Sequence, residues 1–158
     1  MTTGIVRVET PIGLFSAETG DGAVRRAGFD DRAGPQPPER AGTDESVREA
    51  LVAYFGGDLG ALDAIRIDAP GTSFQERVWK LLREIPAGET RTYGDLANDL
   101  GMPGAARAVG MANASNPIGV IVPCHRVVRA GGAIGGYAGG VDRKRWLLEH
   151  ESRTARLV

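Results

Sequence analysis

Short apolar runs alternate with turn residues in the first thirty positions of the chain. Apolar side chains cluster at residues 5–8, 14–17 and 23–29, and Pro, Gly, Thr and Asp occupy the intervening positions 11–13 and 19–22. Short apolar segments bounded by such residues are typical of strands joined by tight turns. The pattern therefore predicts a small antiparallel meander at the N-terminus.

A proline-rich segment and a helix follow. Three prolines at positions 35, 37 and 38 exclude helix from residues 34–42, which we expect to form a flexible surface loop. Apolar residues then recur at three- and four-residue spacing and predict a helix over residues 43–55, ended by Gly56 and Gly57. A second linker-like stretch ends at Pro70 and Gly71, where we place the boundary between domains 1–70 and 71–158.

Helical periodicity dominates after residue 71. Ser73 and Glu76 are spaced as a capping box, and an apolar stripe from Phe74 to Ile85 stops before Pro86. Two short helices are expected at 92–100 and 105–114, joined by a tight turn at 101–104. Two helices joined by a short Gly-containing turn match the helix-turn-helix pattern, which by itself is shared by many helical hairpins.

The second of these two helices is unusual in composition. It consists mainly of Ala and Gly, with Arg107 as its one long side chain. Small residues let a backbone approach another surface closely, so this helix either packs tightly inside the protein or enters a groove with Arg107 projecting. Further along, an apolar run at 118–122 leads to Pro123 and Cys124, and a Gly-rich loop spans 131–140. A last helix is predicted with Asp142 as its N-cap and with Trp146, Leu147 and Leu148 turned inward.

Composition and charge limit the possible functions. The chain has 158 residues, one Cys and two His, which excludes an internal disulfide and a Cys-rich structural zinc site. It has no apolar stretch of membrane-spanning length and no secretory signal pattern, so we expect a cytoplasmic protein. Residues 1–70 carry a net charge of −5 and residues 71–158 a net charge of +4. A chance split between solvated faces and a C-terminal half that meets a polyanion both fit this asymmetry.

Cys124 is the candidate nucleophile. Its apolar surroundings by themselves raise a thiol pKa, and a lone buried Cys is usually a packing residue. The adjacent His125, however, could act as a base, and the following Gly-rich loop with Tyr137 could form a substrate pocket. Such a base needs an orienting acceptor, for which Glu149 and Glu151 on the last helix are the candidates.

Five blocks of sequence form a recognisable series in the C-terminal part of the chain. They are Ala-Ala-Arg-Ala-Val-Gly (105–110), Asn-Pro (116–117), Pro-Cys-His-Arg-Val (123–127), Gly-Tyr-Ala-Gly-Gly (136–140) and Trp-Leu-Leu-Glu-His-Glu (146–151). In their order and spacing, the residues from about 72 to 151 closely resemble the O6-alkylguanine-DNA alkyltransferases, also called methylated-DNA–protein-cysteine methyltransferases. A looser likeness to the opening of that family's N-terminal domain is found at residues 10–14.

The resemblance implies a role for each matching residue of the reaction. Cys124 matches the alkyl acceptor, His125 the base that acts through a bridging water, and Glu151 the acid that orients this His. Asn116 matches the residue that braces the active-site turn. Tyr93 matches the aromatic residue that rotates the target phosphate and helps to protonate the guanine.

The resemblance also implies how DNA and the damaged base are bound. Arg107 matches the finger that fills the space of the flipped nucleotide, flanked by a DNA-contacting surface of small residues, Ala106, Ala108 and Gly110. The guanine pocket is matched by Tyr137, by the backbone around Val127 and at Ala138 and Gly139, and by Asn113 at a pocket-side position. Two of them depart from the family pattern, because many relatives have Ser at position 138 and an apolar residue at position 113. The single Cys also rules out the N-terminal zinc site of some members.

Fold and activity follow as expectations from the same resemblance. The fold would be α+β, with a small antiparallel-sheet α/β domain of ribonuclease H-like type and a mostly helical, winged helix-turn-helix-like domain that docks in the minor groove of double-stranded DNA. The protein would act as a monomer and transfer the methyl group of O6-methylguanine, and of O4-methylthymine, irreversibly to Cys124 after base flipping. The thioether product cannot be hydrolysed, so each molecule would act once, without cofactor or metal.

Two other functions stay open at this point. A non-catalytic sensor could flip the alkylated base and recruit other repair proteins, although such relatives lack the Cys. A thiol hydrolase could be built on Cys124 and His125, although two residues adjacent in sequence form a spatial dyad less naturally.

Overall fold

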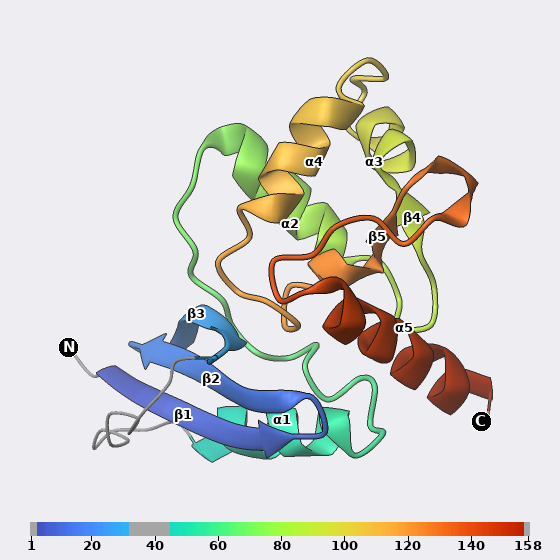
Figure 1. Ribbon diagram of the computed structural model, residues 1–158. Coiled ribbons are helices and arrows are strands. Elements are labelled where there is room, and N and C mark those ends of the chain that lie inside the picture. Colours follow the sequence, from blue (N-terminus) through green and yellow to red (C-terminus); the bar gives the residue numbers. More distant parts are fainter. Residues whose placement is uncertain (1–2, 32–44, 157–158) are drawn as a thin grey trace.

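The N-terminal part of the computed structural model is a three-stranded antiparallel sheet covered on one face by a helix (Figure 1). The structure describes residues 3–31 and 45–156, so the proline-rich segment 34–42 lies outside the described residues. Strands β1 (Thr3–Thr10), β2 (Gly13–Gly20) and β3 (Ala23–Phe29) are ordered β1-β2-β3, and helix α1 spans Glu45–Phe55. The predicted meander is confirmed. The side chains that point inward from alternate positions of the strands pack against Val47, Leu51 and Tyr54 of α1.

Strand β3 also holds the C-terminal half of the chain. The Ala27 N–H donates to the Pro117 carbonyl at 3.0 Å, and the Gly119 N–H donates to the Ala27 carbonyl at 2.9 Å. These two bonds form a parallel bridge between Ala27 and Ile118. The free edge of the small sheet is therefore partly paired by the segment that leads to Cys124.

Helix α2 (Ser73–Arg83) confirms the predicted helix but not its predicted cap. The capping box is formed by Thr72 and Gln75, whose side chains bond each other's backbone N–H groups at 3.1 and 2.9 Å, and Ser73 already lies inside the helix. Thr72 has the extended backbone that an N-cap requires. The helix also ends two residues before Ile85, because the residue preceding Pro86 is disfavoured in helical conformation.

The helix-turn-helix pattern is present as predicted. Helix α3 (Tyr93–Asp99) starts from strand β4 (Arg91–Thr92) with Thr92 as its cap, and α4 (Ala106–Ala114) follows a turn in which Gly101 has a positive φ. Helix α4 packs on α2 and α3, and the Trp79 indole N–H donates to the Ala112 carbonyl at 2.9 Å. This bond fixes α4 against the core while its opposite face stays exposed.

The segment that contains Cys124 lies between α4 and the last helix. A short 3-10 helix η1 (Cys124–Arg126) leads into strand β5 (Val127–Val128), which pairs in parallel with β4, and a second 3-10 turn η2 spans Ala130–Gly132. Helix α5 spans Val141–Arg156.

Helix α5 already includes Val141, so Asp142 lies in its first turn and is not its N-cap. There its negative charge still favours the positive end of the helix dipole. Leu147 is fully buried, whereas Trp146 and Leu148 are only half-buried. None of the helices among residues 3–31 and 45–156 is both long and apolar enough to cross a membrane.

Candidate functional site

Cys124 lies at the end of a tight turn and is 7% exposed. Asn116 braces this turn: its Nδ2 donates to the Val122 carbonyl at 2.9 Å, and its Oδ1 accepts from the Ile118 N–H at 3.0 Å. Val120 inside the turn has a φ of +66°, a conformation that is strained for a β-branched residue. Such strain persists only where the surroundings impose it, and here the bonds of Asn116 contribute to holding it.

A cavity of about 390 Å³ opens beside Cys124. Its size is at the lower end of the range for small-molecule sites. The loop before α5 and the helices α3 and α4 form part of its wall, and strand β3 forms another part. The lining residues are Ala27, Gly28, Phe29, Tyr93, Gly110, Asn113, Ala114, Asn116, Gly119, Cys124, Gly136, Tyr137, Ala138 and Gly139.

Most of the sequence-predicted pocket residues therefore surround one cavity. Tyr93, Asn113, Tyr137, Ala138 and Gly139 all line it together with Cys124. Val127, for which a backbone contribution was expected, is not among the lining residues, and its side chain is fully buried.

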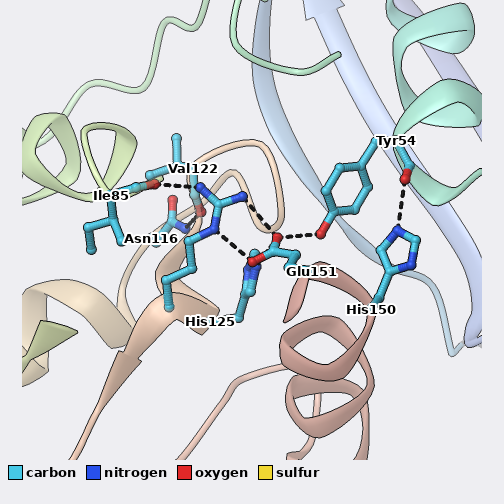
Figure 2. Close-up of polar contacts among 8 residues, drawn as sticks. Tyr54, Ile85, Asn116, Val122, His125, His150 and Glu151 are labelled. Atoms are coloured by element: carbon cyan, nitrogen blue, oxygen red, sulfur yellow. Dashed lines mark hydrogen bonds and ion pairs between the residues drawn. The ribbon is translucent and has the colours of Figure 1, made fainter. Parts of the chain in front are cut away.

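A buried polar network is centred on Glu151 and includes His125, the residue that follows Cys124 in η1 (Figure 2). Glu151 on α5 is 1% exposed and meets His125 Nε2 with its Oε2 at 2.8 Å. Arg126 donates to both oxygens of Glu151, at 2.9 and 2.8 Å, and to the Ile85 carbonyl at 2.7 Å. The Tyr54 hydroxyl on α1 donates to Glu151 at 2.5 Å. Glu151 is thus the acceptor for three side chains, two from η1 and one from α1.

This network fixes the protonation of His125. Burial raises the pKa of the Glu151 carboxyl, but the proximity and hydrogen bonds of His125 and Arg126 outweigh burial and hold this pKa well below its ordinary value. Burial lowers the pKa of His125, despite the opposing effect of Glu151. Because Arg126 already balances the carboxylate charge, His125 is neutral, with Nε2–H donating to Glu151.

The other ring nitrogen is then a base. Nδ1 of neutral His125 carries a lone pair when Nε2 carries the proton. Among the described protein atoms, this buried Nδ1 has no hydrogen-bond partner. It is therefore free to accept a proton, directly or through water.

The cysteine itself is held as a thiol at rest. Burial raises the pKa of Cys124, and the neighbouring Asn116 amide and Lys144 ammonium partly oppose this effect. Lys144 is fully buried, and its Nζ donates to the carbonyls of Val127 at 2.6 Å and Gly136 at 3.1 Å. A nucleophile in this setting needs a base at the moment of reaction.

Two tyrosines on the cavity wall remain protonated at neutral pH. Burial raises the pKa values of both Tyr93 and Tyr137. Each can therefore donate a proton or a hydrogen bond to a molecule in the cavity. Gly139 is required for this arrangement, since a Cβ there would lie 2.7 Å from the Tyr137 ring.

The exposed face of α4 runs from Arg107 toward the cavity. Arg107 and Ala108 are exposed, Ala106 and Gly110 are half-buried, and Gly110 lies at the cavity wall against the Tyr93 ring. Met111, one turn after Arg107, is 70% exposed. The structure thus places these small residues beside one long cation, with the cavity opening at the end of the same helix face.

Sequence reasoning missed several residues of this site. Tyr54, Arg126 and Lys144 were given no role, and neither was strand β3. Glu149, the alternative orienting acid, is exposed and does not join the network. Within residues 3–31 and 45–156, no three His, Cys, Asp or Glu side chains gather in a way that could hold a metal ion.

Comparison with known proteins gives a consistent result. The family model of the 6-O-methylguanine DNA methyltransferase DNA-binding domain matches residues 73–153. A methylated-DNA–protein-cysteine methyltransferase of Mycolicibacterium paratuberculosis is 47% identical over 152 residues, which cover 92% of this chain and 90% of the relative.

Two crystal structures extend the similarity to the whole fold. An O6-methylguanine methyltransferase of Mycobacterium tuberculosis superposes with a TM-score of 0.81 at 39% identity, covering 97% of this chain and 94% of that one. OGT of Mycobacterium tuberculosis in complex with DNA gives a TM-score of 0.80 at 42% identity, covering 95% of this chain and 93% of that one. The chain belongs to the methylated-DNA–protein-cysteine methyltransferase family.

Proposed function

We propose that Cys124 is the residue that accepts the alkyl group when this protein repairs O6-methylguanine in DNA. The activity of the chain is direct-reversal repair by methyl transfer to a cysteine, with DNA as its partner. The observation that carries the assignment is the position of Cys124, the only cysteine of the chain, in the wall of the cavity and directly before His125, whose Nδ1 has no hydrogen-bond partner among the described protein atoms.

The reaction begins with removal of the thiol proton. His125 Nδ1 takes this proton from Cys124 through a bridging water, while Nε2–H stays bonded to Glu151. The carboxylate then stabilises the imidazolium that forms, as in other carboxylate–histidine pairs. Lys144, whose charge lowers the pKa of the thiol, stabilises the thiolate.

The alkyl group then moves in one displacement. The sulfur forms a bond to the methyl carbon, the bond from this carbon to O6 breaks, and its electron pair stays on the base. The base gains a proton from the Tyr93 hydroxyl, and the proton that His125 took from the thiol passes through water to the Tyr93 oxygen. The products are guanine and S-methylcysteine, with Tyr93 and neutral His125 restored. A thioether offers no carbonyl for water to attack, and each molecule therefore reacts once.

Base flipping gives the exposed face of α4 its role. The O6 position lies inside the duplex, so the nucleotide must leave the stack at a cost of a few kcal/mol. The small residues along α4 allow close approach to the minor groove, and Arg107 projects from this face to fill the space left by the base. Asn113, Tyr137, Ala138 and Gly139 then surround the flipped guanine.

Several finer points belong to the same proposal. We infer that the protein acts as a monomer in the cytoplasm and accepts O4-methylthymine as a second substrate. Residues 1–70 would form the α/β domain and residues 71–158 the DNA-binding and alkyl-transfer domain. The modest charge of +4 in the C-terminal half favours weak, salt-sensitive DNA binding.

A defined substrate tests the assignment. The protein is incubated with duplex DNA carrying one O6-methylguanine, and its intact mass is measured. We expect a gain of one methyl group per molecule, located on Cys124 and abolished in Cys124→Ala. Continued turnover of many lesions per molecule would contradict the single-use mechanism.

The same experiment separates the two alternatives. A base sensor would bind the damaged DNA without any gain of mass. A thiol hydrolase would turn over an activated ester and ignore alkylated DNA. A sensor does not transfer the alkyl group and needs no proton acceptor next to Cys124. The buried pair of His125 and Glu151 therefore disfavours this alternative.

A further inference from the structure

Arg143 is the third residue of α5, and its side chain contacts both halves of the chain. Its two terminal nitrogens bind the two carboxylate oxygens of Asp31 at 2.8 and 2.6 Å. Its Nε donates to the Ile12 carbonyl at 2.9 Å, and one terminal nitrogen also donates to the Gly139 carbonyl at 3.3 Å. Its guanidinium carbon lies 4.5 Å from the centre of the Phe29 ring.

Two of the residues that Arg143 contacts form part of the wall of the cavity beside Cys124. Phe29, at the end of β3, and Gly139, in the loop before α5, both line the cavity beside Cys124. The guanidinium therefore joins one wall, contributed by the N-terminal sheet, to another, contributed by the loop. The turn between β1 and β2 is shaped to admit it, because a Cβ on Gly13 would lie 2.8 Å from the Arg143 guanidinium.

We propose that Arg143 is a specificity-determining positioning residue that sets the width of the alkyl pocket by tying the loop at Gly139 to Phe29 and Asp31. This inference rests on the proposed function of the cavity. Arg143 does not touch the reacting atoms. It acts by limiting how far the loop can move away from Cys124 when the alkyl group is larger than methyl.

The contacts of Arg143 with Gly139, Phe29 and Asp31 together form what we call the Arg143 clamp. Loss of this clamp would widen the pocket but leave the rest of its wall in place. The same loop has a second anchor, since Lys144 Nζ binds the carbonyls of Val127 and Gly136 independently of Arg143. Removal of Arg143 thus frees the Gly139 end of the loop and leaves the Gly136 end held. A methyl group would then be aligned less well with the sulfur, whereas a bulky group would gain room.

The test compares two alkyl groups on one substrate. Single-turnover rates are measured with a single-stranded oligonucleotide that carries either O6-methylguanine or O6-benzylguanine, so that base flipping does not contribute. Misplacement of reacting groups by about 1 Å can cost up to about 100-fold in rate. We expect Arg143→Ala to slow methyl transfer by about tenfold and benzyl transfer by less than about twofold, which raises the benzyl-to-methyl ratio at least about fivefold.

The matched control is Arg145→Ala on the same helix. Arg145 is exposed and pairs only with Asp142, at 3.3 Å, among the ion pairs of the described residues, so this change removes the same charge away from the cavity. Its benzyl-to-methyl ratio should equal that of the wild type. Intact mass at the end of each reaction counts the active molecules, and partial unfolding therefore lowers both yields without changing the ratio. Arg143→Lys, which keeps the charge, serves if the alanine variant does not fold.

The outcomes separate the two levels of inference. A wild-type ratio in both Arg143 variants, or an equal change in Arg145→Ala, would overturn the clamp. Absence of any alkylation of the wild-type protein would instead overturn the proposed function of Cys124.

Discussion

Replacement of Glu151 by Gln separates the two tasks of this carboxylate. In the native site Glu151 balances the Arg126 charge and orients His125. The amide removes the negative charge and turns one acceptor oxygen into a donor. If the amide nitrogen is oriented toward Arg126, two hydrogen-bond donors face each other and neither has an acceptor.

The burial of Arg126 and the contact of Glu151 with His125 determine the expected losses of stability and of rate. Arg126 is almost fully buried, and breaking a buried ion pair by removing one partner typically costs about 3–5 kcal/mol. Domains are generally stable by about 5–15 kcal/mol, so the variant is expected to fold with a much reduced margin. The imidazolium formed during the reaction also loses its stabilising carboxylate, and loss of base catalysis typically costs about 100-fold or more in rate.

Two measurements and one double variant make this reasoning testable. Urea unfolding gives the loss of stability, and single-turnover methyl transfer, divided by the active fraction from intact mass, gives the rate per active molecule. Glu151→Gln combined with Arg126→Met removes the buried cation and the opposed donors, so it should recover part of the stability and none of the rate. A normal rate per active molecule in Glu151→Gln, or a recovered rate in the double variant, would refute the orienting role.

Three further outcomes follow from the site. Tyr54→Phe removes one hydrogen bond to a charged group and should lower the free energy of unfolding by about 1.5–3 kcal/mol; an unchanged urea midpoint would contradict this. Arg107→Ala should slow repair of duplex DNA by about tenfold or more while reaction with free O6-alkylguanine base stays near normal, and equal losses on both substrates would exclude the finger role. Because burial lowers the pKa of His125, its neutral form persists below the ordinary value near 6.5. The rate on single-stranded substrate should therefore fall to half only below pH 6.5, and half-loss at pH 6.5 or higher would argue against His125 as the base.

Periodicity and turn residues predicted most of the elements, because each depends on local chemistry. The β1–β2–β3 meander and the helices α1 to α5 were expected within a few residues of their observed ends. The errors concern caps. Thr72, and not Ser73, caps α2, since the backbone conformation that decides between two neighbouring hydroxyl residues is set by how the preceding linker reaches the helix.

The candidate site was predicted where its residues are close in sequence or share a motif. Cys124, His125 and Asn116 lie within ten residues of each other. Tyr54 lies 97 residues from Glu151, and its helical spacing indicated only a core position. A hydroxyl within an otherwise apolar helix face was the one signal available, because a buried Tyr normally needs an acceptor. Arg126 offered a stronger signal, since it follows Cys124 and His125 directly and a buried Arg requires a partner.

The charge shift at residues 70–71 suggested that the reactive half of the chain is separate from the N-terminal half, but the contacts argue for one reactive unit. Ala27 holds the turn before Cys124, and Phe29 forms part of the cavity wall. Tyr54 supplies one of the donors to Glu151. Residues 71–158 alone would therefore lack a wall of the pocket and a partner of the acid behind the base. The N-terminal sheet therefore forms part of the wall of a cavity whose cysteine lies in the basic half of the chain.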